Sequence, residues 1–376
     1  MLTPIMRPAF SSTRAAAAFA LLLLVLLALP AVVGKNLLPP REQAYSIQGW
    51  GNGPYPWIRN QIFEETNAID IALVGSSHLF NAIYTPYVQA QLSARLGRPA
   101  VVRTICWGGA GYDGLYLITQ DLLAHRQVRL LVFYDENPAP GSHTAALPAF
   151  FRFADNAAAL PGLALPEQAL YYFAALVGMP RNLLAQFSPI LPAPLVTDQP
   201  NYWTLTANAP NPANNLGCLS VRKGFAPDPM TPPAPFELFT PQTAASPADA
   251  MFFSTDSKTN FEFSTATLPA WQTHFARHFA ALLQAHDVRA AMLYLPALAE
   301  ARSPVISERS YWPDILDGAT LLGIPPVKLF GGLTDTELHK IYGDPVHFNE
   351  NGQLYFTRLI TPMLIELYQA QGNLNN

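Results

Sequence analysis

The stretch from Ile69 to His78 constrains the fold more than any other part of the chain. It begins with an apolar run of strand-forming residues that ends at Gly75; two serines and a histidine follow, and a helical pattern begins. Strand, tight glycine turn and helix in this order place a side chain at the carboxyl end of a strand, where open α/β sheets keep their sites. We therefore expect an α/β fold in which a serine here acts as a nucleophile, provided that a base reaches it.

The best candidate base lies near the other end of the chain, in residues 343–349. Asp344 precedes His347 by three positions, on a predicted loop that leads into the last helix. A carboxylate so placed can orient an imidazole and stabilise its charged form. Each feature alone is common, but their occurrence after a first strand and before a last helix favours catalysis.

The first third of the chain predicts a parallel sheet. Strands are expected at 69–75, 100–106 and 129–134, with helices at 85–97 and after Gly111. Because strands and helices alternate over so short a length, the connections must be right-handed crossovers between parallel strands.

The last third returns to the same pattern. It predicts a helix over 268–286, a fourth core strand over 288–295 and a short edge element within 321–330. A terminal helix follows residue 349, with a kink expected at Pro362.

Residues 145–265 interrupt this pattern. A helical portion is predicted up to residue 186, and proline is then dense from Pro189 to Pro247, which disfavours long helices and central strands. We interpret the segment as an irregular insertion that either covers the carboxyl edge of the sheet or is a surface excursion without function.

The amino terminus predicts export. Arg7 and Arg14 precede an uncharged apolar stretch over 15–33, a length at the lower edge of a membrane span. We expect a signal anchor over 15–34, with a signal cleaved near Gly34 as the alternative. Residues 1–14 would then be cytoplasmic, 35–66 an extended linker, and 67–376 a domain on the periplasmic or extracellular side.

The charge and composition of the chain limit the kinds of partner that it can bind. Charged residues make up only 13% of the chain, the net charge is −4, and no run of Lys or Arg occurs, so nucleic-acid binding is excluded. The two cysteines, Cys106 and Cys218, either form a disulfide in an exported compartment or are small buried hydrophobic residues.

Three other features invite functional interpretations. His78 is expected to be a helix-start residue that points away from the site, with contact to substrate as the alternative. His274 and His278 have metal-ligand spacing, but no acidic residue lies between them, so a surface pair is expected. The glycine-rich turn at 108–111 lacks the Lys-Ser/Thr of a phosphate-binding loop.

Four segments together resemble the four blocks of the SGNH/GDSL-type hydrolases. They are Gly75–His78, the turn at 108–111, the polar end of the third strand at 134–137, and Asp344–His347. The resemblance implies a three-layer α/β/α sandwich with a mostly parallel sheet, and no cofactor or metal. Its membrane-tethered branch looks closest, namely the polysaccharide O-acetyltransferases and the D-alanyl transfer protein of teichoic acids.

The resemblance assigns roles to individual residues. Ser77 becomes the nucleophile, His347 the base and Asp344 its orienting carboxylate. The oxyanion hole would combine the Ser77 N–H, the Gly108 N–H and the Asn137 side chain. The sequence departs from the family where Ser76 replaces the usual Asp and Cys106 the frequent Asn. The third block also lacks its glycine, which leaves Asp135 or Glu136 as alternatives to Asn137.

The expected function follows from these roles. We predict an exported, membrane-anchored serine hydrolase of acyl esters, or an O-acyltransferase, that acts on cell-envelope polysaccharide or exopolysaccharide. An integral membrane partner would supply the acyl group. The alternative is a catalytically inactive carbohydrate-binding or assembly subunit on the same fold.

Overall fold

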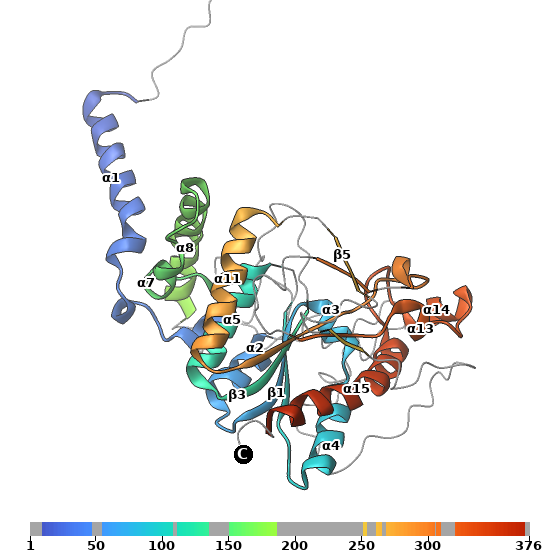
Figure 1. Ribbon diagram of the computed structural model, residues 1–376. Helices are drawn as coiled ribbons and strands as arrows, with labels where there is room; N and C mark the ends of the chain where they lie inside the picture. Colours follow the sequence, from blue (N-terminus) through green and yellow to red (C-terminus); the bar gives the residue numbers. More distant parts are fainter. Residues whose placement is uncertain are drawn as a thin grey trace, which may run out of the picture.

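The fold is α/β, as predicted (Figure 1). The structure is a computed structural model that describes residues 10–46, 55–107, 111–134, 150–185, 251–253, 261–264, 268–304, 306–309 and 320–372.

A six-stranded sheet forms the centre of the molecule. Its order is β2-β1-β3-β6-β8-β4, the first five strands are mutually parallel, and β4 is antiparallel at the edge. The strands are β1 (Ile69–Gly75), β2 (Val102–Cys106), β3 (Val128–Phe133), β4 (Met251–Phe253), β6 (Arg289–Leu293) and β8 (Thr320–Gly323). The predicted parallel sheet is confirmed.

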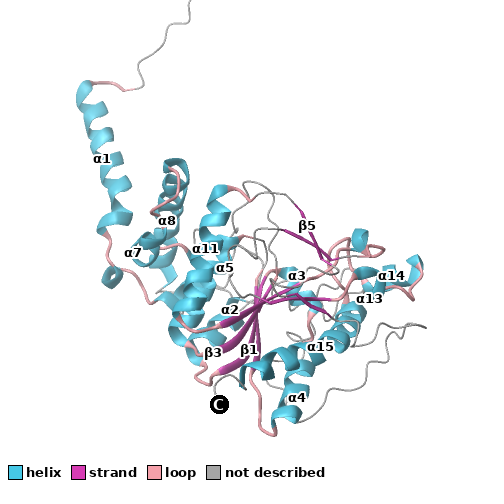
Figure 2. Cartoon of the chain, viewed as in Figure 1, coloured by secondary structure: helices cyan, strands magenta, loops and turns pink. Residues whose placement is uncertain are grey.

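Helices cover both faces of this sheet (Figure 2). One face packs against α3 (Ser77–Ala82), α4 (Thr85–Leu96) and α15 (Glu350–Gly372), and the other against α5 (Tyr112–His125) and α11 (Ala270–Ala285). All residues of β1 are buried because its side chains point alternately to two faces that are both covered by helices. Leu73 belongs to the core under α4 and α15, and Val74 belongs to the core under α5 and α11.

The segment before the sheet differs from the expected extended linker over 35–66. It contains η2 (Arg41–Ser46), α2 (Tyr55–Arg59) and η3 (Asn60–Glu64). Arg41 Nε donates to both carboxylate oxygens of Asp121 at 2.9 Å, and Tyr45 Oη donates to the same carboxylate at 2.6 Å. Because Tyr45 is fully buried with these partners, the segment is part of the domain.

Two long helices lie outside the sheet layers. The apolar helix α1 (Thr13–Val32) projects from the domain in Figure 1, and among its residues only Pro30 is buried. Its 20 residues are enough for a single membrane span or signal anchor. Beside its base lies α8 (Leu165–Ala185), preceded by the short α7 (Phe153–Asn156).

Three details differ from the sequence-based expectation. Besides β4, a second strand falls within the stretch expected to be irregular: β5 (Phe261–Ser264) pairs in parallel with β7 (Ile306–Arg309) in a separate two-stranded sheet. β8 lies inside the main sheet rather than at its edge. The second half of the expected edge element forms the short helix α13 (Pro326–Leu329), because Pro325 and Pro326 start a helical turn. The proline-dense residues 189–247 lie outside the described part of the chain.

Candidate active site

Ser77 lies at the junction between β1 and α3. The strand ends at Gly75, Ser76 has an extended backbone (φ −92°, ψ −169°), and α3 begins at Ser77. The Ser76 side chain is buried, at 2% exposure, whereas Ser77 is partly exposed. Of the two serines, Ser77 therefore presents its hydroxyl at the carboxyl end of the strand.

Ser77, His347 and Asp344 form one hydrogen-bonded line. Ser77 Oγ lies 2.8 Å from His347 Nε2, although the two residues are 270 positions apart. His347 Nδ1 lies 2.7 Å from Asp344 Oδ2. Since a carboxylate only accepts hydrogen bonds, Nδ1 carries the proton and Nε2 is left to accept from the serine hydroxyl. This is the connectivity of a Ser-His-Asp triad.

Asp344 is held in its ionised form. Its other oxygen, Oδ1, accepts the backbone N–H groups of Val346 and His347, each at 2.8 Å. Partial burial works to raise the pKa of Asp344, but these hydrogen bonds and the contact with His347 outweigh it and hold the pKa below its usual value. At neutral pH the carboxylate can therefore orient the imidazole and stabilise its protonated form.

The loop that carries Asp344 and His347 is closed by backbone hydrogen bonds. Gly343 N donates to His347 O at 2.8 Å, and Leu298 N donates to Pro345 O at 2.9 Å from the segment that follows β6. The first turn of α15 packs tightly against the residues before this loop, because a Cβ on Gly352 would clash with the carbonyl oxygen of Ile341. The two side chains are thus presented on a constrained loop.

Helix α15 brings this loop to Ser77 by docking on α3. The buried Gln353 side chain donates from Nε2 to the carbonyl oxygens of Phe80, at 3.0 Å, and Ile83, at 3.2 Å. One turn later, Thr357 Oγ1 accepts the backbone N–H of Tyr84 at 2.7 Å. Sequence reasoning missed these positioning residues; the available signal was two polar residues within the apolar stripe of the last helix.

The neighbouring strands end beside Ser77. Gly75 is in register with Cys106 of β2, and Trp107 N donates to Gly75 O at 3.0 Å. Cys106 is buried and its Sγ lies 3.7 Å from Leu73 O. On the other side β3 ends level with β1, since Val74 is in register with Phe133.

The other residues that the resemblance assigned to the oxyanion hole lie outside the described part of the chain. These are Gly108 and Asn137, together with Asp135 and Glu136; Cys218 also lies outside it. Their roles stay predictions, although the described ends of β2 and β3 lead towards Ser77.

His78 contacts the site instead of pointing away from it. Its ring stacks on the His347 ring, with centroids 4.5 Å apart and planes inclined by 17°. The His78 ring also lies beside the Tyr134 ring, with centroids 5.1 Å apart. Burial and the nearby His347 lower the pKa of His78 to about 4, against the opposing effect of Asp344. A neutral imidazole therefore lies against the candidate base and restricts its ring plane. The prediction that His78 points away was wrong because His78, in the first turn of α3, lies beside the loop that carries His347.

His274 and His278 form a partly exposed pair on α11. His274 Nε2 lies 2.7 Å from the carbonyl oxygen of Ala159, and the two rings are 4.5 Å apart. In the described residues, no group of three His, Cys, Asp or Glu side chains is placed to hold a metal ion.

No protein-family model, no curated protein and no solved structure matches this chain. Functional interpretation therefore depends on the geometry of the site and on the four sequence blocks.

Proposed function

We propose that the chain is a membrane-tethered serine acyl-ester hydrolase or O-acyltransferase of the SGNH type. Its domain would be the family's three-layer α/β/α sandwich, with helices on both faces of the parallel sheet as support. The observation that carries the proposal is the hydrogen-bonded line from Ser77 through His347 to Asp344, at 2.8 and 2.7 Å.

The mechanism follows from the donor and acceptor roles in that line. Ser77 Oγ attacks the ester carbonyl carbon while its proton passes to His347 Nε2, and Asp344 stabilises the resulting imidazolium. As the tetrahedral intermediate collapses, the C–O bond to the leaving alcohol breaks and His347 returns the proton to that oxygen. Water or a sugar hydroxyl then gives its proton to His347 and attacks the acyl carbon, and His347 passes the proton to Ser77 Oγ as the bond between that oxygen and the acyl group breaks.

The negative charge on the carbonyl oxygen needs hydrogen-bond donors. The first N–H groups of a helix have no partner within the helix, so the Ser77 N–H at the start of α3 suits this task. We assign the second and third donors to Gly108 and Asn137, on the resemblance alone. One such donor is worth about 3 kcal/mol in the transition state.

The location of the domain is part of the proposal. Helix α1 is suited to a single span or signal anchor. Arg7, before this helix, and Arg14, in its first turn, favour a cytoplasmic amino end, which would put the domain on the periplasmic or extracellular side. There it would act on cell-envelope polysaccharide or exopolysaccharide, with an acyl group delivered by an integral membrane partner.

Covalent labelling tests the nucleophile. The full chain in detergent micelles is incubated with a fluorophosphonate and digested for mass spectrometry; we expect the adduct on Ser77. Ser77→Ala and His347→Ala should abolish labelling, whereas Ser76→Ala, a matched change at the adjacent buried serine, should keep most of it. A folded wild-type chain that takes up no probe would contradict the proposal and favour the inactive carbohydrate-binding or assembly subunit.

A further inference from the structure

Among the side chains of α8 that the structure describes, the exposed ones are apolar. Its exposed hydrophobic side chains follow helical spacing and have exposed fractions of 79% at Leu165, 43% at Leu170, 60% at Phe173, 37% at Val177 and 51% at Leu184. A helix on the surface of a water-soluble domain normally places polar residues on its exposed face. A continuous apolar strip of this kind marks an interaction surface.

The opposite face of α8 already has its partner. Tyr171, Ala174 and Ala175 are buried in the core that also contains α5 and α11. The tyrosine hydroxyl donates to Asp113 at 3.2 Å, which fixes the helix on the domain. The outward strip is therefore a second apolar face, and folding of the described domain leaves it uncovered.

Helix α1 gives the depth of this strip relative to a membrane. Tyr172, next to Phe173, donates its hydroxyl hydrogen to the carbonyl oxygen of Leu27. The 20 residues of α1 have a length of about 30 Å, the thickness of the hydrocarbon core, so the carboxyl-terminal end of a spanning α1 lies near the hydrocarbon boundary. Leu27 lies five residues before the end at Val32, hence roughly 8 Å inside the hydrocarbon boundary.

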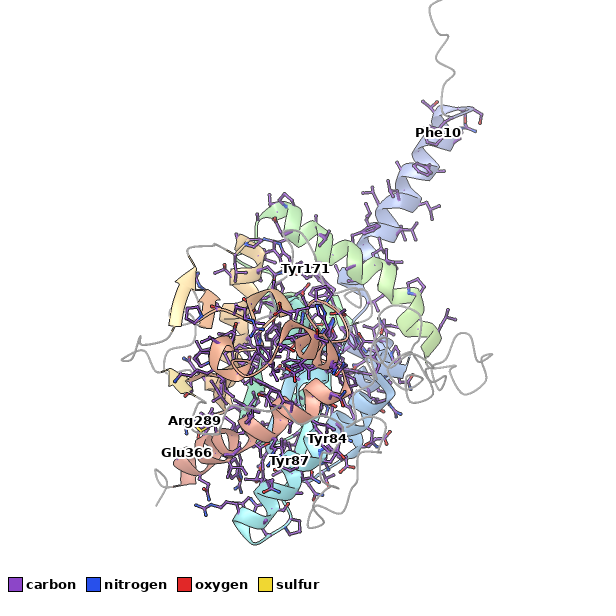
Figure 3. All side chains as sticks on the ribbon, turned by 90° about the vertical axis from the view of Figure 1, so that its right-hand side faces the viewer. Phe10, Tyr84, Tyr87, Tyr171, Arg289 and Glu366 are labelled. Carbon is purple, nitrogen blue, oxygen red and sulfur yellow. The ribbon has the colours of Figure 1, made fainter. Side chains whose placement is uncertain are left out.

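The neighbouring residues fit the same boundary. Lys35 follows α1 with a side chain that is 68% exposed, and its ammonium group lies 3.7 Å from Asp155 of α7. A lysine just beyond a span suits the level of the lipid headgroups, and a tyrosine suits the boundary between headgroups and chains. In Figure 3, α8, which carries the labelled Tyr171, lies across the domain at the base of α1.

We propose that α8 is an interfacial helix whose apolar strip inserts into the leaflet that the carboxyl-terminal end of α1 crosses. The occupant of the strip is bilayer lipid. An amphipathic helix in this position buries its apolar face about 5–10 Å into the boundary between headgroups and acyl chains, which agrees with the depth of Leu27. Together, α1 and α8 hold the domain at two places and fix its orientation to the membrane.

Depth-dependent fluorescence quenching tests this inference. Cys106 and Cys218 are replaced by alanine, and single cysteines are introduced as Phe173→Cys, Ala94→Cys or Leu23→Cys. Ala94 is an exposed control on α4, and Leu23 is a control inside α1. Each full-length variant is labelled with a bimane probe and reconstituted into phosphatidylcholine vesicles that contain either nitroxide-labelled lipid or aqueous iodide.

We expect the probe at position 173 to respond as at position 23, with strong quenching by the lipid nitroxide and weak quenching by iodide. The probe at position 94 should show the reverse. Iodide quenching at 173 equal to that at 94 would overturn the inference. Shielding from both quenchers, with a doubled mass in sedimentation, would overturn it in favour of a second copy of the chain. None of these outcomes depends on the activity of Ser77.

Discussion

At the scale of single residues, the pair of stacked imidazoles distinguishes this site. In the proposed acyl transfer His347 accepts a proton, whereas His78 is held neutral at pH 7 because its pKa is lowered to about 4. A neutral ring against the base restricts its orientation without adding a positive charge. The two ring centroids lie 4.5 Å apart, and this neighbour contributes to the lowered pKa of His78.

His78 should make the stability of the protein depend on pH. In the unfolded chain its pKa is near the ordinary value of 6.5, and in the folded chain it is about 4, so the unfolded state binds more protons between these values. Stability should fall as the pH drops from 6.5 to 4, by up to about 3 kcal/mol. His78→Phe keeps a stacked ring but cannot titrate, and urea unfolding of both proteins in micelles at pH 7 and pH 4.5 should show a smaller loss in the variant. Equal losses would contradict this assignment.

At the scale of elements, the docking of α15 on α3 determines whether Ser77 meets His347. The contact is polar and buried: Gln353 bonds two carbonyl groups near the end of α3. Gln353→Leu preserves the approximate volume but leaves both carbonyl groups without this donor, which costs about 1–3 kcal/mol. It also lets the loop that carries His347 shift relative to Ser77.

The change should be visible in chemistry as well as stability. A shift of about 1 Å can lower a rate by about a hundredfold, so we expect the fluorophosphonate reaction of Gln353→Leu to slow by about ten- to a hundredfold. The matched control is Gln369→Leu on the same helix, whose side chain accepts a hydrogen bond from Nε of the exposed Arg95 at 3.1 Å. An unchanged labelling rate in Gln353→Leu would show that the hydrogen bonds of Gln353 do not position His347 relative to Ser77.

The same elements show what the sequence could predict. β1 occurs at the predicted residues 69–75, because a long apolar run bounded by a glycine is a strong local signal. The proximity of Ser77, His347 and Asp344 was also expected, since each lies where its local pattern meets a strand end or a helix start. β4 and β5 were missed because strands of three and four residues carry no readable period.

Contacts between distant residues explain the other differences. The segment around Arg41 and Tyr45 has the composition of a linker, and its partner Asp121 lies 80 residues from Arg41. The stacking of His78 depends on the loop at 343–347, which only the docking of α15 brings near. Neither relation leaves a pattern in the local sequence.

At the scale of the whole molecule, the proposed membrane tether bears on which acceptor takes the acyl group in the proposed reaction. A hydrolase of soluble esters gains little from attachment to a membrane. A transferase gains proximity to its acyl donor when the proposed partner lies in the same bilayer. Attachment through α1, and through α8 as inferred above, would also hold Ser77 in a constant orientation to that partner.

We therefore predict that a carbohydrate hydroxyl is a better acceptor than water. The full chain in phosphatidylcholine vesicles should hydrolyse p-nitrophenyl acetate slowly, and oligosaccharides added from a panel of envelope and exopolysaccharide fragments should raise nitrophenol release severalfold. Mass spectrometry should then find acetylated sugar, because the sugar hydroxyl resolves the acyl-Ser77 intermediate that water attacks poorly. Ser77→Ala with the same acceptors should yield none. Equal turnover with and without every acceptor, with acetate and no acetylated sugar formed, would contradict this prediction. The protein would then be a plain esterase, because water alone would resolve the acyl-Ser77 intermediate.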